Sequence, residues 1–439
     1  MKKFWFQSFI ITVFVFFLLW GANKATDLKI FTAFDSMGQA LRDFELTDYA
    51  LSNLREQFKE DDRIILVNIG NLSRREVAQQ IMIINSFQPR LIAFDGFFDC
   101  EGGLRDSLNC PQLLDTLGNL MLSNAIQNAN KFVLATKMLQ TDSLARYDSN
   151  ESDSLEYSDP IFNNYAEHGF VTLPTDANYQ EDVKQCRTVY PRRLIKGKEE
   201  LAFSVRIAME YDSVKTKKFL ARAKDEELVN FKRNIEVRTL RLNSLKNDEV
   251  STTNFGTQYY TVDIYDLQDE KVLPGLFKDN IVMMGFMGDY LGDPSWDDKF
   301  FTPLNKTIGG RANPDMFGLV VHANVVSMIL DDDPIDTIPD WLKYTVAFLV
   351  CIFTVALFIW IDQHLPMWFD ALSVIIQLTE VLFISLFIIQ AFSWWNLKLD
   401  LGIAIGISAL VGPAYDIFKS LQNEINRRLT KRRDRVSNL

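Results

Sequence analysis

The densest cluster of side chains able to do chemistry lies in one short loop, GDYLGDPSWDDKF. Its four aspartates are Asp289, Asp293, Asp297 and Asp298. Carboxylate oxygens are preferred ligands of hard cations, so the cluster could form an oxygen-lined cation site. The spacing is not that of an EF-hand, and Gly, Pro and Asp are also ordinary turn residues. The loop is therefore either a cation site or a plain turn.

Two further places carry polar residues next to apolar segments. Asp95 ends the apolar run LIAF, and the carboxyl ends of strands form the ligand crevice of open parallel sheets. Asp95 is therefore a candidate ligand contact, and a turn cap before Gly96 is the alternative. His322 and Asn324 stand at the start of an apolar helix, where a lone histidine is more often a structural hydrogen-bond partner than a catalyst.

Catalysis is not indicated. The three histidines, His168, His322 and His364, form no recognisable Ser/His/Asp pattern. The segment Gly285 to Gly288 follows a strand but has neither a G-x-G-x-x-G nor a GK[ST] sequence. We therefore expect a protein that is not an enzyme and that needs no cofactor.

Cysteine use is sparse. Cys100 and Cys110 bound the loop CEGGLRDSLNC, so an oxidising compartment could close a small disulfide ring there. No CxxC pair is present, so structural zinc is not indicated.

The elements that must position these residues follow a strand–helix–strand order. Ser73 and Glu76 form a predicted capping box at the start of a helix. Short apolar runs rich in β-branched residues predict strands that are covered on both faces. The βαβ order places such strands in one parallel sheet. The predicted strands are 63–70, 90–98, 132–136, 169–173, 187–194, 259–263 and 280–288, and the predicted helices are 28–58 (amphipathic, with a break), 73–87, 113–130, 199–212 and 320–330. The charged stretch 216–249 is interpreted as a solvated insertion.

Four apolar runs predict membrane-spanning helices at 4–22, 341–361, 367–392 and 399–418. We interpret the first as an uncleaved anchor, because its end has no A-x-A-like site; a cleaved signal peptide is the alternative. Tryptophans at the ends of the other runs suit the headgroup level. The sequence therefore predicts an α/β extracytoplasmic domain with a mostly parallel central sheet, plus an α-helical transmembrane part of four spans.

Charge in the short flanks predicts the orientation. Lys2 and Lys3 precede the first span, and the tail 419–439 holds seven basic and two acidic residues. Both termini, 1–3 and 419–439, are therefore expected in the cytoplasm, and 23–340 on the periplasmic side of a bacterial inner membrane. That region carries 35 basic and 50 acidic residues, so it is not expected to bind nucleic acid.

Glu380 lies in the middle of the third span. An ionisable side chain at this depth usually faces a partner helix or a polar cavity. We therefore predict that Glu380 contacts another helix, of this chain or of a partner, and that the contact carries assembly or signal.

The order of several motifs resembles the second type of CHASE domain, the cyclase- and histidine-kinase-associated sensory extracellular module. The matching segments are IILVNIG, LIAFDGFF, HGFVTLPTDANYQEDVKQCRTVYPRR, KDNIVMMGFMGDYLGDPSWDDKFFTPLN and GLVVHANVVSMIL, with one span before and three after. The resemblance covers about residues 30–330. It implies a sensor, and the positions closest to the pattern are Asp95, Asp182, Arg187, Asp293, Thr302, Pro303, His322 and Asn324. The candidate ligand-binding residues among them are Asp95, Asp182, Arg187, Asp293, His322 and Asn324.

The chain departs from the pattern in two ways. Asn68 stands where the first strand usually ends in an acidic residue, and NLSRR replaces a Trp/Pro/Arg-rich motif. Members commonly carry a cytoplasmic cyclase or kinase after the last span, whereas about twenty residues follow Phe418 here, too few for a catalytic domain.

Two functions fit these features. The first is a sensor or receptor subunit that binds a ligand or envelope protein and signals to a separate cytoplasmic effector. The second is a scaffold subunit of a cell-envelope membrane complex, without a ligand. The expected partners are the lipid bilayer and a protein in the membrane or cytoplasm; self-association stays open.

Overall fold

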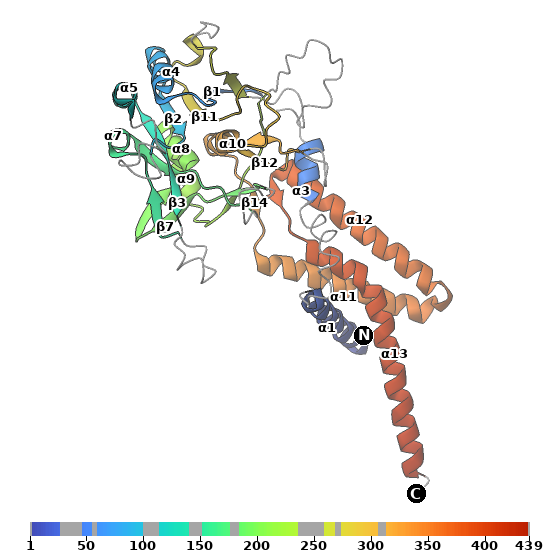
Figure 1. The fold of residues 1–439 in the computed structure, drawn as a ribbon. Helices are drawn as coiled ribbons and strands as arrows, with labels where there is room; N and C mark the ends of the chain where they lie inside the picture. Colours follow the sequence, from blue (N-terminus) through green and yellow to red (C-terminus); the bar gives the residue numbers. More distant parts are fainter. Residues whose placement is uncertain are drawn as a thin grey trace. The chain divides into compact units, whose positions relative to one another are not determined.

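The computed structural model describes residues 2–26, 46–54, 59–99, 114–139, 152–175, 184–235, 259–267, 274–305 and 313–437. The chain forms two compact units (Figure 1). One is the α/β unit, Leu51–Ile335, and the other is the helical unit, Met1–Ala50 with Asp336–Leu439.

A mostly parallel sheet forms the centre of the α/β unit, as predicted. Its order is β10-β1-β11-β2-β3-β4, with β5 also paired to β3, and β4 is its antiparallel member. The strands are β1 Asp61–Asn68, β2 Leu91–Asp95, β3 Phe132–Leu139, β4 Ser154–Glu156, β5 Glu167–Phe170, β10 Tyr259–Val262 and β11 Ile281–Gly285.

The late strand β11 lies between the two early strands of the βαβ unit, so β1 and β2 are not direct neighbours. All five residues of β11 are buried, and so are the last five of β1. Central parallel strands covered on both faces need such continuous apolar runs. This burial explains why IILV and IVMM read as strands from the sequence.

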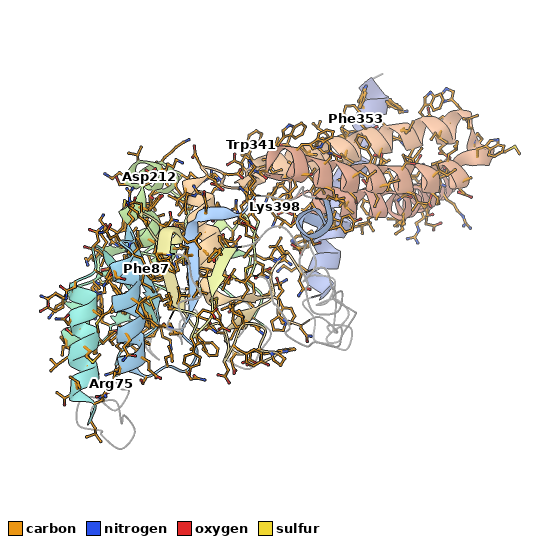
Figure 2. The ribbon with its side chains drawn as sticks, turned by 90° about the horizontal axis from the view of Figure 1, so that it is seen from above. Arg75, Phe87, Asp212, Trp341, Phe353 and Lys398 are labelled. Carbon is orange, nitrogen blue, oxygen red and sulfur yellow. The ribbon has the colours of Figure 1, made fainter. Side chains whose placement is uncertain are left out.

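Helices α4 (Arg74–Ser86) and α5 (Thr116–Gln127) lie side by side and cover one face of the sheet; Figure 2 marks Arg75 and Phe87 at the two ends of α4. The predicted capping box at the start of α4 is confirmed. The Ser73 amide donates to the Glu76 carboxylate at 2.8 Å, and the Glu76 amide donates to the Ser73 hydroxyl at 3.4 Å.

The opposite face is covered by α8 (Phe203–Tyr211) and α10 (Gly318–Leu330). A Cβ added to Gly285 would lie 3.1 Å from Leu319 of α10, and one added to Gly169 would lie 2.5 Å from the Cα of Phe203. Every residue of α10 is buried. A helix that is apolar on all sides is expected in such a central position.

Short elements complete the α/β unit. They are η2 Ala50–Leu54, which overlaps the unit boundary, α7 Pro160–Asn163, β6 Thr188–Val189, β7 Arg192–Ile195, β8 Lys198–Leu201, α9 Ser213–Leu220, β9 Glu227–Leu228, η5 Pro274–Leu276, β12 Lys299–Phe300 and β13 Met316–Phe317.

Three predictions in this unit are wrong. The single strand 187–194 is divided: β6 pairs with β9, whereas β7 forms a hairpin with β8. The helix predicted at 199–212 begins only at Phe203, because residues 198–201 pair in that hairpin. Residues 229–235 of the predicted solvated insertion are buried.

Among its described residues, the helical unit contains four helices that are long and apolar enough to cross a membrane. They are α1 Lys2–Thr26, α11 Asp340–His364, α12 Phe369–Trp395 and α13 Gly402–Ser437. Helix α13 packs against the other three. The remaining elements of the unit are α3 Leu46–Tyr49, β14 Asp336–Thr337, η6 Pro366–Trp368 and β15 Leu397–Lys398, with β14 parallel to β15. Of the amphipathic helices predicted at 28–58, the described residues 46–54 form α3 and η2.

Candidate functional site

Polar residues meet at the carboxyl edge of the sheet. The last residues of β1, β11 and β2 are Asn68, Gly285 and Asp95, and they lie opposite one another in register. This edge is where open parallel sheets bind ligands. The structure therefore places Asp95 where the sequence predicted it.

Asn68 organises this edge through its side-chain amide. Its Nδ2 donates to Asp263 and to the Gly288 carbonyl, both at 3.0 Å. Its Oδ1 accepts from the amides of Gly70 at 3.0 Å and Met287 at 2.9 Å. An acidic side chain could not make both donations, so the departure from the family pattern at this position has a structural reason.

The carboxyl groups of Asp95 and Asp298 interact electrostatically, and we call these two residues the acid pair. Asp298 follows β11 in the sequence. Burial, and to a lesser extent the nearby charge of Asp298, together raise the pKa of Asp95 to about 8. Desolvation of the carboxyl group raises the pKa of Asp298 to about 6, although the positive charge of Lys184 opposes this rise. A carboxyl pair of this kind can take up a proton near neutral pH.

Asp298 also contacts the start of α10. The Gly318 amide donates to the Asp298 carbonyl at 2.9 Å, and a Cβ on Gly318 would lie 3.0 and 3.2 Å from the Asp298 carboxylate oxygens. The backbone φ of Asp298 is 54°, a left-handed conformation that costs free energy for a residue other than glycine. The acid pair therefore lies at the positive end of the α10 dipole.

The other loop aspartates accept hydrogen bonds from neighbouring residues. Asp293 accepts from the amides of Asp289 at 3.0 Å and Ser295 at 2.8 Å, and these bonds lower its pKa. Asp297 accepts from the Ser295 hydroxyl at 2.8 Å. Within the described residues, no three His, Cys, Asp or Glu side chains are grouped to hold a metal ion. The cation site and the plain turn both stay predictions for this loop.

His322 and Asn324 lie inside the α/β unit. Burial lowers the pKa of His322 to about 4, and its ring packs edge-on against Phe203 at 5.5 Å. The Asn324 side chain accepts from the amides of Lys232 and Arg233 at 3.0 and 3.1 Å and donates to the Arg233 carbonyl at 2.8 Å. Asn324 therefore fastens the segment 229–235 to α10.

The other predicted site residues are placed as follows. Arg187 precedes β6, and its carbonyl accepts from the Val229 amide at 2.9 Å. Thr302 donates to Asp315 through its hydroxyl at 2.6 Å. Asp182, Cys100 and Cys110 lie outside the described residues.

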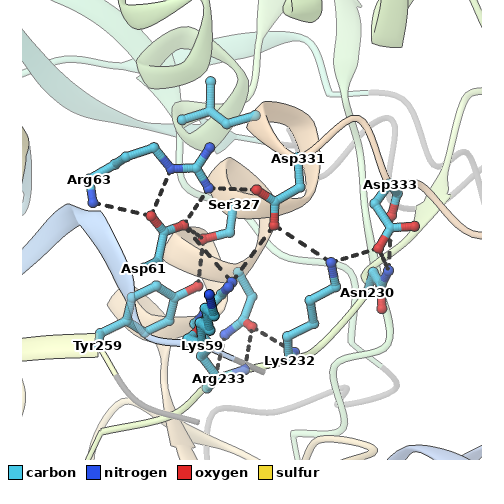
Figure 3. Close-up of polar contacts among 12 residues, drawn as sticks. Lys59, Asp61, Arg63, Asn230, Lys232, Arg233, Tyr259, Ser327, Asp331 and Asp333 are labelled. Carbon is cyan, nitrogen blue, oxygen red and sulfur yellow. Dashed lines mark hydrogen bonds and ion pairs between the residues drawn. The ribbon is translucent and has the colours of Figure 1, made fainter. Parts of the chain in front are cut away.

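A network of charged residues lies at the opposite, amino-terminal edge of the sheet, and we call it the amino-edge network (Figure 3). Arg63 donates to both carboxylate oxygens of Asp61 at 2.7 Å and to Asp331 at 2.6 Å. Ser327 of α10 donates to Asp61 at 2.7 Å. Burial raises the pKa of Asp61, but the hydrogen bonds and charge of Arg63 outweigh burial and lower it.

The buried segment 229–235 supplies the remaining cations of the network. Lys232 lies 2.6 Å from Asp333 and 3.6 Å from Asp331. Arg233 donates to the Lys59 carbonyl at 2.9 Å and lies 3.9 Å from Asp61. The network therefore joins the start of β1 to residues 331–333, which follow α10 (Figure 3).

Sequence reasoning missed this network because 216–249 was interpreted as solvated. Lys232 and Arg233 are only 7% and 6% exposed. A weak signal is present, because apolar Val229, Phe231 and Ile235 lie among the polar residues. The carboxylate partners of Lys232 and Arg233 lie far away in the sequence, so charge patterning alone could not find the pairs.

In the helical unit, Glu380 of α12 contacts α11. The Thr354 hydroxyl donates to its carboxylate at 2.5 Å. One turn earlier in α12, Gln377 donates to the carbonyls of Ser408 and Ala409 of α13, both at 3.0 Å. Polar side chains of α12 therefore link it to both neighbouring helices.

Comparison with known proteins identifies a family. The CHASE2 domain model matches residues 12–359, well over half of the chain. No curated protein and no solved structure matches. The matched residues contain the whole α/β unit, with both the acid pair and the amino-edge network. The chain therefore belongs to the CHASE2 family of sensory extracellular domains.

Proposed function

We propose that the chain is a sensor or receptor subunit of a bacterial inner membrane. Its α/β unit lies in the periplasm, binds a ligand or an envelope protein, and signals to a separate cytoplasmic effector. Both termini lie in the cytoplasm. The proposal assigns no catalytic step to the chain.

Helix α10 is the observation that carries this proposal. Its first residue, Gly318, contacts Asp298 of the acid pair, and its last turn contributes Ser327 to the amino-edge network. Thirteen helical residues span roughly 20 Å. Because α10 is buried along its whole length, a shift at the carboxyl edge would move the network as well.

The network lies where the chain leaves the α/β unit. Asp331 and Asp333 pair with Arg63 and Lys232, and the Arg222 guanidinium donates to the Ile335 carbonyl at 3.1 Å. The membrane-spanning helix α11 begins at Asp340, five residues after Ile335. A change at the carboxyl edge could therefore alter how this connection is held.

The orientation rests on the charges of the flanks. Lys2 and Lys3 and the basic tail after Phe418 favour the cytoplasmic side, and an even number of spans agrees. Each end of the spans has its own ion pair. Lys343 binds Asp400 at 2.8 Å at one end, and Lys419 binds Asp362 at 2.6 Å at the other. These pairs give each end of the bundle a polar boundary.

Purification from the native membrane tests the proposal. The full-length protein would carry its affinity tag at the N-terminus, and untagged membranes would be the control. Mass spectrometry of the mild-detergent eluate should identify a cytoplasmic kinase, cyclase or regulator. Recovery of envelope components alone would contradict the sensor proposal and favour a scaffold, because a sensor must reach a cytoplasmic effector. The two also differ in that a scaffold needs one state and a sensor needs two.

A further inference from the structure

Helix α13 continues well beyond its apolar part. It runs without interruption from Gly402 to Ser437, and each residue from Ser420 to Thr430 is exposed. Figure 1 shows this end of α13 as a single helix beyond α1, α11 and α12. Because residues 420–430 are exposed in the described structure, solvent or another molecule must cover this part of the helix.

One face of this extension is apolar. Leu421, Ile425 and Leu429 are 51%, 57% and 59% exposed. Their spacing of four residues places them along one face of the helix, and we call them the α13 stripe. Single exposed apolar residues are normal, but three in line on an unpacked helix are typical of an interaction surface.

The charges around the α13 stripe select its occupant. Residues 419–437 carry seven basic and two acidic side chains, so a second copy laid along the stripe would bring two strongly positive helices together. Glu424 is also engaged, because Arg428 donates to it at 2.9 Å. The surrounding charge favours a partner with acidic residues.

The lipid surface is a poorer occupant. The apolar span predicted from the sequence ends at Phe418, and α13 continues beyond it as one helix, so the extension leads away from the bilayer rather than along it. At about 1.5 Å per residue, Leu429 lies roughly 15 Å beyond Lys419. Amphipathic helices that bind lipid instead lie in the plane of the interface.

We propose that the α13 stripe docks an acidic amphipathic helix of the cytoplasmic effector. The partner helix would present apolar residues to Leu421, Ile425 and Leu429, with Asp and Glu on its flanks facing the arginines. This inference rests on the proposed function, because it names the surface through which that effector binds.

Site-specific photo-crosslinking in the native membrane tests the contact. A photoreactive phenylalanine analogue would replace Leu421, Ile425 or Leu429, and Asn423 or Thr430 on the opposite face as controls. Crosslinks from the stripe alone, to an acidic amphipathic segment of a cytoplasmic protein, would support the proposal. Crosslinks to a second copy, to lipid, to both faces equally or to nothing would overturn it.

A charge substitution separates this inference from the proposed function. Ile425→Glu should lower recovery of the effector on the order of tenfold, because it places a carboxylate in an apolar contact. Asn423→Glu makes the same charge change on the opposite face and should leave recovery unchanged. Equal recovery with both variants would overturn the docking surface alone, whereas no effector with the unmodified protein would overturn the proposed function.

Discussion

The guanidinium of Arg63 binds the carboxylate of Asp331 at 2.6 Å, although 268 positions separate the two residues in the sequence. Arg63 lies near the start of β1, and Asp331 is the C-cap of α10. The same guanidinium also holds Asp61, whose side chain is 1% exposed. One side chain therefore ties the start of β1 to the end of α10.

Arg63→Met should destabilise the α/β unit by about 3 kcal/mol, because it leaves the buried carboxylate of Asp61 without its main partner. The thermal unfolding midpoint of the full-length protein in detergent should fall on the order of 6–12 °C. Arg75→Met is the matched control, since Arg75 and its partner Asp115 are exposed to 45% and 34%. Equal midpoints for the two variants would show that the network contributes nothing.

Asn68→Asp should destabilise the unit by about 2–4 kcal/mol. Asn68 is fully buried and donates to Asp263, so a carboxylate there would lose both donations and face a like charge. Acidification should restore part of the loss, because a protonated Asp can donate one hydrogen bond. Asn71→Asp, an exposed position that donates to Asp289, should change the unfolding midpoint far less; a larger effect there would refute this assignment.

Gly169→Ala should destabilise the protein by about 1–3 kcal/mol, since overpacking forces backbone shifts. A Cβ at this position would lie 2.5 Å from the Cα and 2.8 Å from the backbone nitrogen of Phe203. Gly275→Ala is the control, because nothing lies within 4 Å of a Cβ at that position. Denaturant midpoints measure both, and a tolerated Gly169→Ala would mean that α8 can move away from β5.

Asp95→Asn should change how stability depends on pH. The pKa of Asp95 is raised to about 8 in the folded protein, above its value of about 4 in the unfolded chain. Its contribution is therefore fully present below about pH 4 and is lost as the pH rises towards 8. The variant should unfold several degrees above the unmodified protein at pH 8 and near it at pH 4. A difference that does not depend on pH would contradict the raised pKa of Asp95.

The sequence predicted what depends on local pattern. The buried strands and the capping box of Ser73 and Glu76 are confirmed, because periodicity and end signals act over a few residues. It also placed Asp95 at the end of a strand. It did not separate Asp298 from Asp293, because only the turn geometry directs the first towards α10 and the second towards its own loop.

The sequence failed where tertiary contacts override local character. Lys232 and Arg233 read as solvent-exposed, yet Asp61, Asp331 and Asp333 neutralise them in the interior. Residues 199–201 are predicted to begin a helix, yet they pair with residues 192–194 across a turn. In the first case the deciding partners lie far away in the sequence, whereas in the second a local hairpin pairing prevails over helix propensity.

The most direct test of the sensor proposal asks whether a change in the α/β unit reaches the cytoplasm. Cells would carry the unmodified protein, Asp95→Asn or the exposed control Asn71→Ala, and the activity of the co-purified effector would be measured per amount recovered. The sensor proposal predicts that Asp95→Asn shifts this activity several-fold while the control does not. Identical activity in all three, at equal recovery, would contradict it.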